Sequence, residues 1–326
     1  MSSRDPRPGR GWAPLGGGPV SGELISRRRA LGLAAAACAV GSGAVTAACS
    51  AEGEHAGPTS ATAATRAAAR AVRPRRIAYG RDRSQYGELY LPTAARRRGL
   101  VVVVHGGFWQ AQYTAGLGAS LALDLARRGW AAWNLEYRRL GDGGGWPATF
   151  DDVAAGIDVL ATPGLASAAL DLTRVVAVGH SAGGHLAVWA ASRAGLPAVA
   201  PGASPRVRVR GAVSQAGVLD LVRAAETSLG GTAAADLMGG SPGEVPGRYA
   251  LASPIARVPI GVPVRCVHSP DDGIVPMEQS RRYVDAAVQR GDDATLVRTT
   301  GDHFALVTVG SPAWSATVAQ LPGLIG

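Results

Sequence analysis

The feature that most constrains this chain is a turn in which a serine lies between two glycines directly after a buried strand. The apolar, β-branched run Arg174–Val178 predicts the strand, and a helical pattern follows over Leu186–Ser192. Between them, residues 179–183 read Gly-His-Ser-Ala-Gly, with Ser181 at the centre. A bend this sharp strains the serine backbone and leaves no room for side chains at the glycines. It lifts the Ser181 hydroxyl out of the sheet, beside a helix N-terminus, so the turn predicts an activated nucleophile.

A second loop, upstream, predicts groups that stabilise negative charge. The run Leu100–Val104 has the composition of a fully buried parallel strand, and residues 105–110 continue it as His-Gly-Gly-Phe-Trp-Gln. Backbone N–H groups fixed in such a loop stabilise the charge on a carbonyl oxygen during acyl transfer, typically by about 3 kcal/mol. Gly107 and Phe108 are the favoured donors in this loop, and the sequence does not choose between them. Ala182, directly after the serine, is the other expected donor.

A serine hydroxyl also needs an imidazole, oriented by a carboxylate, to remove its proton. Three histidines follow Ser181. His185 lies one helical turn further on, where packing explains it, and His268 closes an apolar strand. Only His303 lies in a late loop between a strand and a final helix, so His303 is the predicted base. His105 is expected to brace its own loop by hydrogen bonding.

The acid is expected in the loop 269–276, which follows the strand ending at His268. Asp271 and Asp272 both have a suitable position. Paired aspartates in loops commonly form turns and caps, so one of the two is expected to have only that role. Asp302 is expected to shape the turn beside His303, and Glu136, at the end of a core strand, to be a buried structural carboxylate.

These motifs resemble those of the α/β-hydrolases in the esterase, lipase and kynurenine formamidase group, over most of the chain after residue 76. The resemblance rests on residues 105–110 and on 179–187, Gly-His-Ser-Ala-Gly-Gly-His-Leu-Ala. Supporting stretches lie at 85–92, 134–139 and 249–254. Phe108, where a third glycine could stand, is more similar to arylformamidases than to the hormone-sensitive-lipase-type esterases.

The resemblance implies roles for individual residues. Ser181 is the implied nucleophile and His303 the implied base. Asp272 is the implied acid, because the family spacing puts the acid four residues before Pro276, and Asp271 remains the alternative. The implied oxyanion hole is formed by Gly107, Phe108 and Ala182.

The alternation of strands and helices favours an α/β-hydrolase fold, with a mostly parallel twisted sheet, helices on both faces and a small cap. An antiparallel hairpin is expected at 77–79 and 88–91, ahead of the first parallel strand at 101–104. Further strands are expected at 131–135, 174–178, 208–213, 264–268 and 295–299, and two of the helices at 118–128 and 151–160.

The periodic pattern weakens over 219–255, where glycine pairs and prolines predict a cap over the active site. Trp109, Tyr113 and Met238 are predicted to line a substrate pocket, and Trp146 its rim. Further candidate lining residues are Phe108, Leu229, Leu237 and Tyr249. The alternative is that these side chains only pack the cap onto the domain.

The N-terminus has the pattern of an export signal over residues 1–49. Ser-Arg-Arg-Arg at 26–29 resembles a twin-arginine motif, and an uncharged Ala/Gly-rich run follows over 30–51. Thr-Ala-Ala-Cys at 46–49 resembles a lipobox, which would make Cys49 a lipidated membrane anchor; a plain signal-peptidase cut is the alternative. The composition of residues 50–75 predicts a disordered linker, and the catalytic domain is expected over residues 76–326. We therefore expect an exported protein, either lipid-anchored in the cell envelope or secreted.

Composition excludes several other classes of protein. The formal net charge is +9, but residues 1–76 hold eleven Arg against four acidic residues, so the domain itself carries only +2. This charge does not favour nucleic-acid binding. Cys266 stands alone in a core strand, so no internal disulfide is expected. No spacing of cysteine and histidine suggests a metal site, and the expected chemistry needs no cofactor.

The sequence thus predicts a serine hydrolase that cleaves a small carboxylic ester through an acyl-enzyme. Hydrolysis of an arylformamide of the N-formylkynurenine type, by the same machinery, is the first alternative. The second is a catalytically inactive fold that serves as a binding module.

Overall fold

The computed structural model describes residues 72–93, 97–164 and 170–325. The predicted export signal, Cys49 and nearly all of the predicted linker lie outside the described residues. The first strand begins at Arg75, one residue before the predicted start of the domain.

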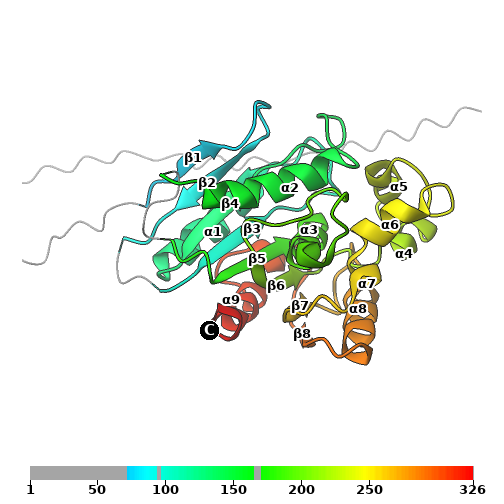
Figure 1. The fold of residues 1–326 in the computed structure, drawn as a ribbon. Helices are drawn as coiled ribbons and strands as arrows, with labels where there is room; N and C mark the ends of the chain where they lie inside the picture. The colour runs from blue at the N-terminus through cyan, green and yellow to red at the C-terminus, as the bar shows by residue number, and fades with distance from the viewer. Residues whose placement is uncertain (1–71, 94–96, 165–169, 326) are drawn as a thin grey trace, which may run out of the picture. The chain divides into compact units, whose positions relative to one another are not determined.

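The described residues form an eight-stranded sheet in the order β1-β2-β4-β3-β5-β6-β7-β8 (Figure 1). Strands β1 and β2 are antiparallel to each other, β2 is antiparallel to β4, and the remaining pairs are parallel. The strands are β1 Arg75–Ala78, β2 Tyr86–Tyr90, β3 Leu100–Val104, β4 Ala131–Leu135, β5 Val175–His180, β6 Val209–Gln215, β7 Val264–His268 and β8 Ala294–Arg298.

The central strands are apolar on both sides because each side faces a hydrophobic cluster. Along β3, Val102 and Val104 pack into one cluster, whereas Val101 and Val103 pack into the other. All five residues of β3 are buried. A parallel strand covered on both faces has this uninterrupted apolar composition, which is why the sequence identified it.

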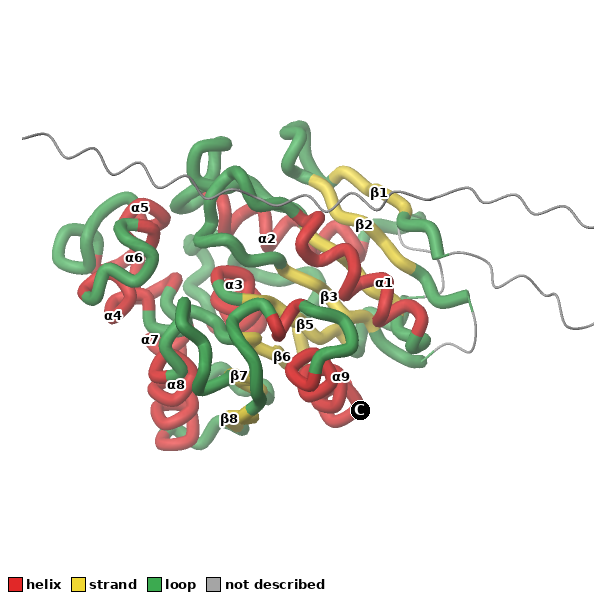
Figure 2. Tube along the Cα trace, turned by 180° about the vertical axis from the view of Figure 1, so that it is seen from behind, coloured by secondary structure: helices red, strands yellow, loops and turns green. Residues whose placement is uncertain are grey.

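Helices cover both faces of the sheet (Figures 1 and 2). Helices α1 and α9 contribute side chains to the cluster that holds Val101, and α2, α3 and α8 contribute to the cluster that holds Val102. Helices α4, α5 and α6 are grouped together beside α7. The helices are α1 Ala119–Arg127, α2 Ala148–Asp158, α3 Ala182–Ser192, α4 Leu221–Glu226, α5 Ala233–Met238, α6 Pro246–Ala252, α7 Pro254–Arg257, α8 Glu278–Gln289 and α9 Pro312–Ile325.

The predicted secondary structure agrees closely with this fold. The strands expected at 131–135 and 264–268 have those bounds, and the others differ by one or two residues at most ends. The first hairpin is antiparallel, as expected. Within the described ranges, no helix combines the length and the apolar character needed to cross a membrane.

Candidate active site

Ser181 lies in a strained turn between β5 and α3. Its φ of 56° and ψ of −122° are unusual for a residue with a side chain. The flanking glycines are there because the backbone comes very close: a Cβ atom on Gly183 would clash with the carbonyl oxygens of Val104 and His105, and one on Gly179 would clash with Gly183. The sharp turn predicted from the sequence is therefore confirmed.

We expect Gly183→Ala to destabilise the fold by about 1–3 kcal/mol, as overpacking a tight contact generally does. The added methyl group has to push the start of α3 away from β3, and Ser181 moves with it. Urea unfolding of both proteins measures the loss. Gly247→Ala in α6 is the matched control, because a Cβ at Gly247 meets open space; an equal effect of the two substitutions would contradict the close-contact argument.

His303 and Asp272 form a direct contact. The Nδ1–H of His303 donates to Oδ2 of Asp272 over 2.7 Å, which leaves Nε2 as the ring nitrogen able to accept a proton. His303 follows β8 and Asp272 follows β7, so the parallel pairing of these strands brings the two loops together. Asp302 caps its own turn by accepting from the backbone N–H groups of Phe304 and Ala305, as expected.

Asp272 is held as a charged carboxylate. Burial raises its pKa, but hydrogen bonds from His268, His303 and two backbone amides outweigh burial and hold the pKa well below its usual range. The two amides are those of Ile274 and Val275, each 2.9 Å from Oδ1. Asp271, by contrast, is exposed. Of the two aspartates left open by the loop sequence, Asp272 is the one that contacts the imidazole.

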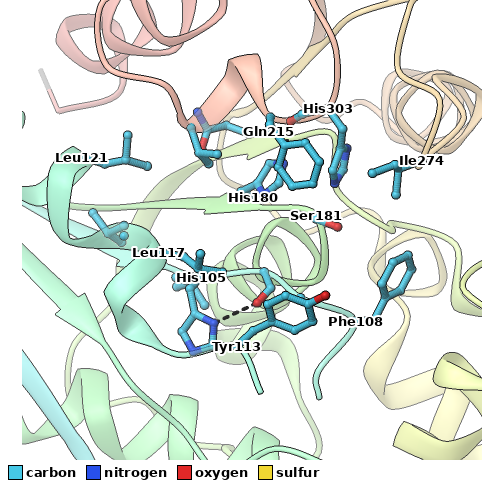
Figure 3. A pocket seen from close by; sticks show the side chains of 17 residues that line it. His105, Phe108, Tyr113, Leu117, Leu121, His180, Ser181, Gln215, Ile274 and His303 are labelled. Atoms are coloured by element: carbon cyan, nitrogen blue, oxygen red, sulfur yellow. Dashed lines mark hydrogen bonds between the residues drawn. The ribbon is translucent and has the colours of Figure 1, made fainter. Parts of the chain in front are cut away.

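Ser181 and His303 line the same cavity, which has a volume of about 160 Å³ (Figure 3). Phe108 and Ile274 lie on one side of Ser181, and Leu117 and Leu121 on the other. The cavity is also lined by Val103, Gly107, Tyr113, His180, Gln215, Phe304 and Val307. Its walls are thus mostly apolar, with polar groups close to the serine.

The predicted pocket was only partly right. Tyr113 and Phe108 line the cavity, but Trp109 and Met238 do not, and both are buried in the core. The indole of Trp109 points towards α3, where Nε1 donates to Nδ1 of His185 over 3.2 Å. Met238 is enclosed where the cap helices pack on the domain.

The segment that was expected to cap the active site packs on the domain. No residue from 219–255 is among the described residues that line this cavity, although Gly230 packs against the Phe108 ring. Leu229, Leu237 and Tyr249 belong to the core packing, and Trp146 packs on Phe150 instead of forming the rim. The physical reason is that short helices need their few large apolar side chains to attach to the domain.

Sequence reasoning missed Leu117, Leu121, Ile274, Phe304 and Val307 as lining residues. Leu121 lies on the apolar face of α1, which from sequence is indistinguishable from ordinary core packing. Phe304, which is 58% exposed, directly follows the predicted base, and this position was the signal in the sequence that could have identified it.

The loop after β3 adopts a conformation that most side chains avoid. Gly107, Phe108 and Trp109 have φ values of 108°, 49° and 57°. Gly107 and Phe108 line the same cavity as Ser181. The N–H of Ala182 is the first in α3, so it has no carbonyl within its own helix to accept it.

A buried charged network braces this loop. His105 contacts Oε1 of Glu136 over 3.0 Å through Nε2, and the carbonyl oxygen of Gly106 over 2.9 Å through Nδ1. Arg139 donates to Glu136 and to the carbonyl oxygen of Tyr113. Both expectations, a bracing His105 and a structural Glu136, are confirmed by these contacts. The strained loop is therefore tied to β4 by charge-assisted hydrogen bonds.

Two further buried histidines stay neutral. Burial, followed by repulsion from His303, lowers the pKa of His180 to about 3. Burial lowers the pKa of His185 to about 4. His180 donates through Nε2 to the carbonyl oxygen of His303 over 2.9 Å, and its ring packs on the His303 ring. It therefore helps to position the imidazole.

These two histidines predict a loss of stability in mild acid. In the unfolded chain both histidines become protonated as the pH falls below the ordinary histidine pKa of 6.5. In the folded protein His185 becomes protonated only near pH 4 and His180 only near pH 3. The contribution of this pair to the free energy of unfolding is therefore fully present above about pH 6.5, and it decreases as the pH falls towards 4. Between pH 7.5 and 4.5 we expect a loss on the order of 5 kcal/mol from this pair.

Urea unfolding at pH 7.5, 6.0 and 4.5 measures this dependence. His185→Gln keeps one donor and one acceptor but cannot titrate, so the variant should lose about half of the histidine-linked pH dependence. Equal unfolding free energies at pH 7.5 and 4.5 in the unsubstituted protein would show that the histidines are not held neutral.

The described residues contain no group of three or more His, Cys, Asp or Glu side chains arranged to hold a metal ion. Cys266 is buried, as its place in a core strand predicted.

Solved structures with the same architecture are α/β-hydrolases that carry esterase names. A truncated carbohydrate esterase from gut microbiota superposes with a TM-score of 0.66 at 22% identity, over 76% of this chain and 94% of its own. Esterase B from Lactobacillus rhamnosis superposes with a TM-score of 0.67 at 20% identity, over 78% of this chain and 86% of its own. An acetyl ester-xyloside bifunctional hydrolase from Caldicellulosiruptor lactoaceticus superposes with a TM-score of 0.60 at 21% identity, over 78% of this chain and 98% of its own.

These likenesses establish the α/β-hydrolase fold, and the fold predicted from the sequence is confirmed. The names agree with the esterase side of the predicted resemblance, and none of the three is a formamidase. No curated protein matches the chain in a sequence comparison. The BD-FAE family matches residues 88–286, more than half of the chain. The protein is therefore a member of the BD-FAE family.

Proposed function

We propose that the protein is a serine hydrolase that cleaves small carboxylic esters through an acyl-enzyme. The observation that carries this proposal is the convergence of three groups. The strained Ser181 and the imidazole of His303 line one cavity, and Asp272 binds the far side of that imidazole. A nucleophile, a base and an orienting acid in this arrangement are what acyl transfer requires.

The first half of the reaction forms the acyl-enzyme. Ser181 Oγ attacks the ester carbonyl carbon while its proton passes to His303 Nε2, and the carbonyl electrons move to the oxygen. The backbone N–H groups of Gly107 or Phe108, together with that of Ala182, stabilise this oxyanion. When the carbonyl re-forms, the alcohol leaves and takes the proton from His303. Asp272 stays charged and holds the imidazolium in place.

The second half releases the acid. Water gives a proton to His303 and attacks the acyl carbon, and the collapse of the second oxyanion returns the proton to Ser181. No cofactor enters either step. The cavity volume of about 160 Å³ is close to that of a cavity that holds one benzene molecule, about 150 Å³. We therefore expect the site to favour short groups, of about six non-hydrogen atoms, over an octanoyl chain.

Arylformamide hydrolysis is the second candidate, since it uses the same groups. The feature that suggested it was the Phe108–Trp109 pair, and Trp109 serves packing instead. We therefore rank it below ester hydrolysis. A binding module without catalytic activity is the third candidate, and the groups that converge on the cavity disfavour it.

The test is a comparison of kcat/KM for p-nitrophenyl acetate, p-nitrophenyl octanoate, an acetylated xyloside and N-formylkynurenine. We expect turnover of the acetyl esters, weaker turnover of the octanoate and no formamide cleavage. A fluorophosphonate probe should label the peptide that carries Ser181, as read by mass spectrometry. Rapid formamide cleavage would reverse the ranking, and a protein that neither turns over esters nor is labelled would be the inactive module.

A further inference from the structure

Gln215 is a polar residue in the cavity that the hydrolytic mechanism does not use. It is the last residue of β6, and its backbone oxygen accepts the N–H of Ser181 over 2.8 Å. Its side chain is fully buried and lines the cavity. Figure 3 shows it on the cavity wall, towards the Leu121 side from Ser181.

The hydrogen bonds of Gln215 fix which end of its amide is free. Nε2 donates to the carbonyl oxygen of Leu306 over 2.6 Å and to Oγ1 of Thr317 over 3.0 Å. Both hydrogens are thereby used. A flipped amide would put its oxygen against the Leu306 carbonyl oxygen, so this orientation is required. Oε1 remains, buried and without a hydrogen-bond partner among the described residues.

A buried acceptor without a donor is unfavourable, and proteins seldom keep one without a reason. Val103, Leu117, Leu121 and Val307 also line the cavity, and none of them has a side-chain donor. Because Gln215 lines the cavity, a molecule that occupies the cavity can supply the missing donor.

We propose that Oε1 of Gln215 accepts a hydrogen bond from a hydroxyl group on the part of the ester that enters the cavity. This inference rests on the proposed function and narrows it. The preferred substrate then carries a short aliphatic group with one hydroxyl, on either the acyl or the alcohol side. An unsubstituted group of equal length fills the apolar space but leaves Oε1 unpaired, and sites built to bind a hydroxyl discriminate strongly against such analogues.

The test compares matched pairs of esters. On the acyl side the pairs are p-nitrophenyl hexanoate with 6-hydroxyhexanoate, and butanoate with 3-hydroxybutanoate. On the alcohol side the pair is 1-butyl acetate with the monoacetate of 1,4-butanediol. We expect kcat/KM to be higher by about 10-fold or more for the hydroxy ester in at least one pair, and the pair that responds identifies the side that enters the cavity.

Gln215→Met tests the residue itself, because methionine has a similar length and no amide. The hydroxyl preference should fall to about 1, whatever happens to the overall rate. Thr317→Val is the matched control, since it removes a partner of Nε2 and leaves Oε1 unchanged. We expect this variant to keep the preference.

The outcomes separate the two proposals. Ester turnover with no hydroxyl preference in any pair would overturn this inference and leave the proposed function standing. This outcome is measured on the unsubstituted protein, so it does not depend on whether a variant folds. A preference that survives in Gln215→Met would overturn the assignment to Gln215. The absence of any ester turnover would overturn both.

Discussion

Replacing Ser181 by alanine is expected to lower kcat/KM for p-nitrophenyl acetate by about 10,000-fold to 1,000,000-fold. The substitution removes the atom that forms the acyl-enzyme, and no other hydroxyl lies on the same turn. The residual rate should be that of water in a cavity with oxyanion donors. Because the substitution removes a single atom and keeps the Cβ in place, the free energy of unfolding should change little.

The double variant gives the sharper version of this test. Ser181→Ala and His303→Ala should each lower kcat/KM by nearly the whole factor given above. The double variant should lower it no further than either single variant, because the base has no role without its nucleophile. Initial rates with matched urea unfolding curves separate lost chemistry from lost folding. If Ser181→Ala kept more than about a hundredth of the activity, the nucleophile would have to be sought elsewhere.

Asp272→Asn is expected to lower kcat by about 10,000-fold. The asparagine keeps an oxygen for the backbone N–H groups of Ile274 and Val275, so the loop should hold its shape. The charge that stabilises the imidazolium is lost, and an amide NH2 facing His303 favours the wrong tautomer. The change should appear in kcat more than in KM, since Asp272 contacts the base and not the substrate.

Asp271→Asn provides a control one residue away. Asp271 is exposed and belongs to the same turn, where its backbone N–H donates to Ser269. Its substitution should change kcat by less than about threefold, as surface substitutions away from special contacts generally do. Equal losses in the two variants would mean that the turn matters and not the Asp272–His303 contact.

The sequence identified local structure well because local rules decide it. The strands at 100–104 and 175–180 are buried on both faces, so their composition is apolar throughout. The need for glycine at 179 follows from the turn alone, because a Cβ there would meet Gly183 of the same turn, whereas a Cβ on Gly183 would meet the carbonyl oxygens of Val104 and His105 at the end of β3.

The pocket could not be predicted in this way. Trp109 directly follows a residue of the candidate oxyanion hole, and yet its positive φ turns the indole into the core to bind His185. Met238 belongs to the segment expected to form a cap, but that segment uses its apolar side chains to pack on the domain. Periodicity shows that a side chain is apolar, not which of two apolar environments it enters.

The sequence by itself determined the strand–turn–helix around Ser181, the alternation that builds the sheet, and the choice of His303 among the later histidines. The tertiary structure places Asp272, the acid that the family resemblance implied, against the imidazole. Only the tertiary structure decided that Leu117, Leu121 and Val307 help to form the cavity, and that Oε1 of Gln215 has no donor among the described residues. The physical reason is the sequence separation of the residues that determine each feature. Turns and strands follow from neighbours along the chain, whereas a cavity is the space left between elements distant in sequence, and its chemistry depends on which atoms remain unpaired there.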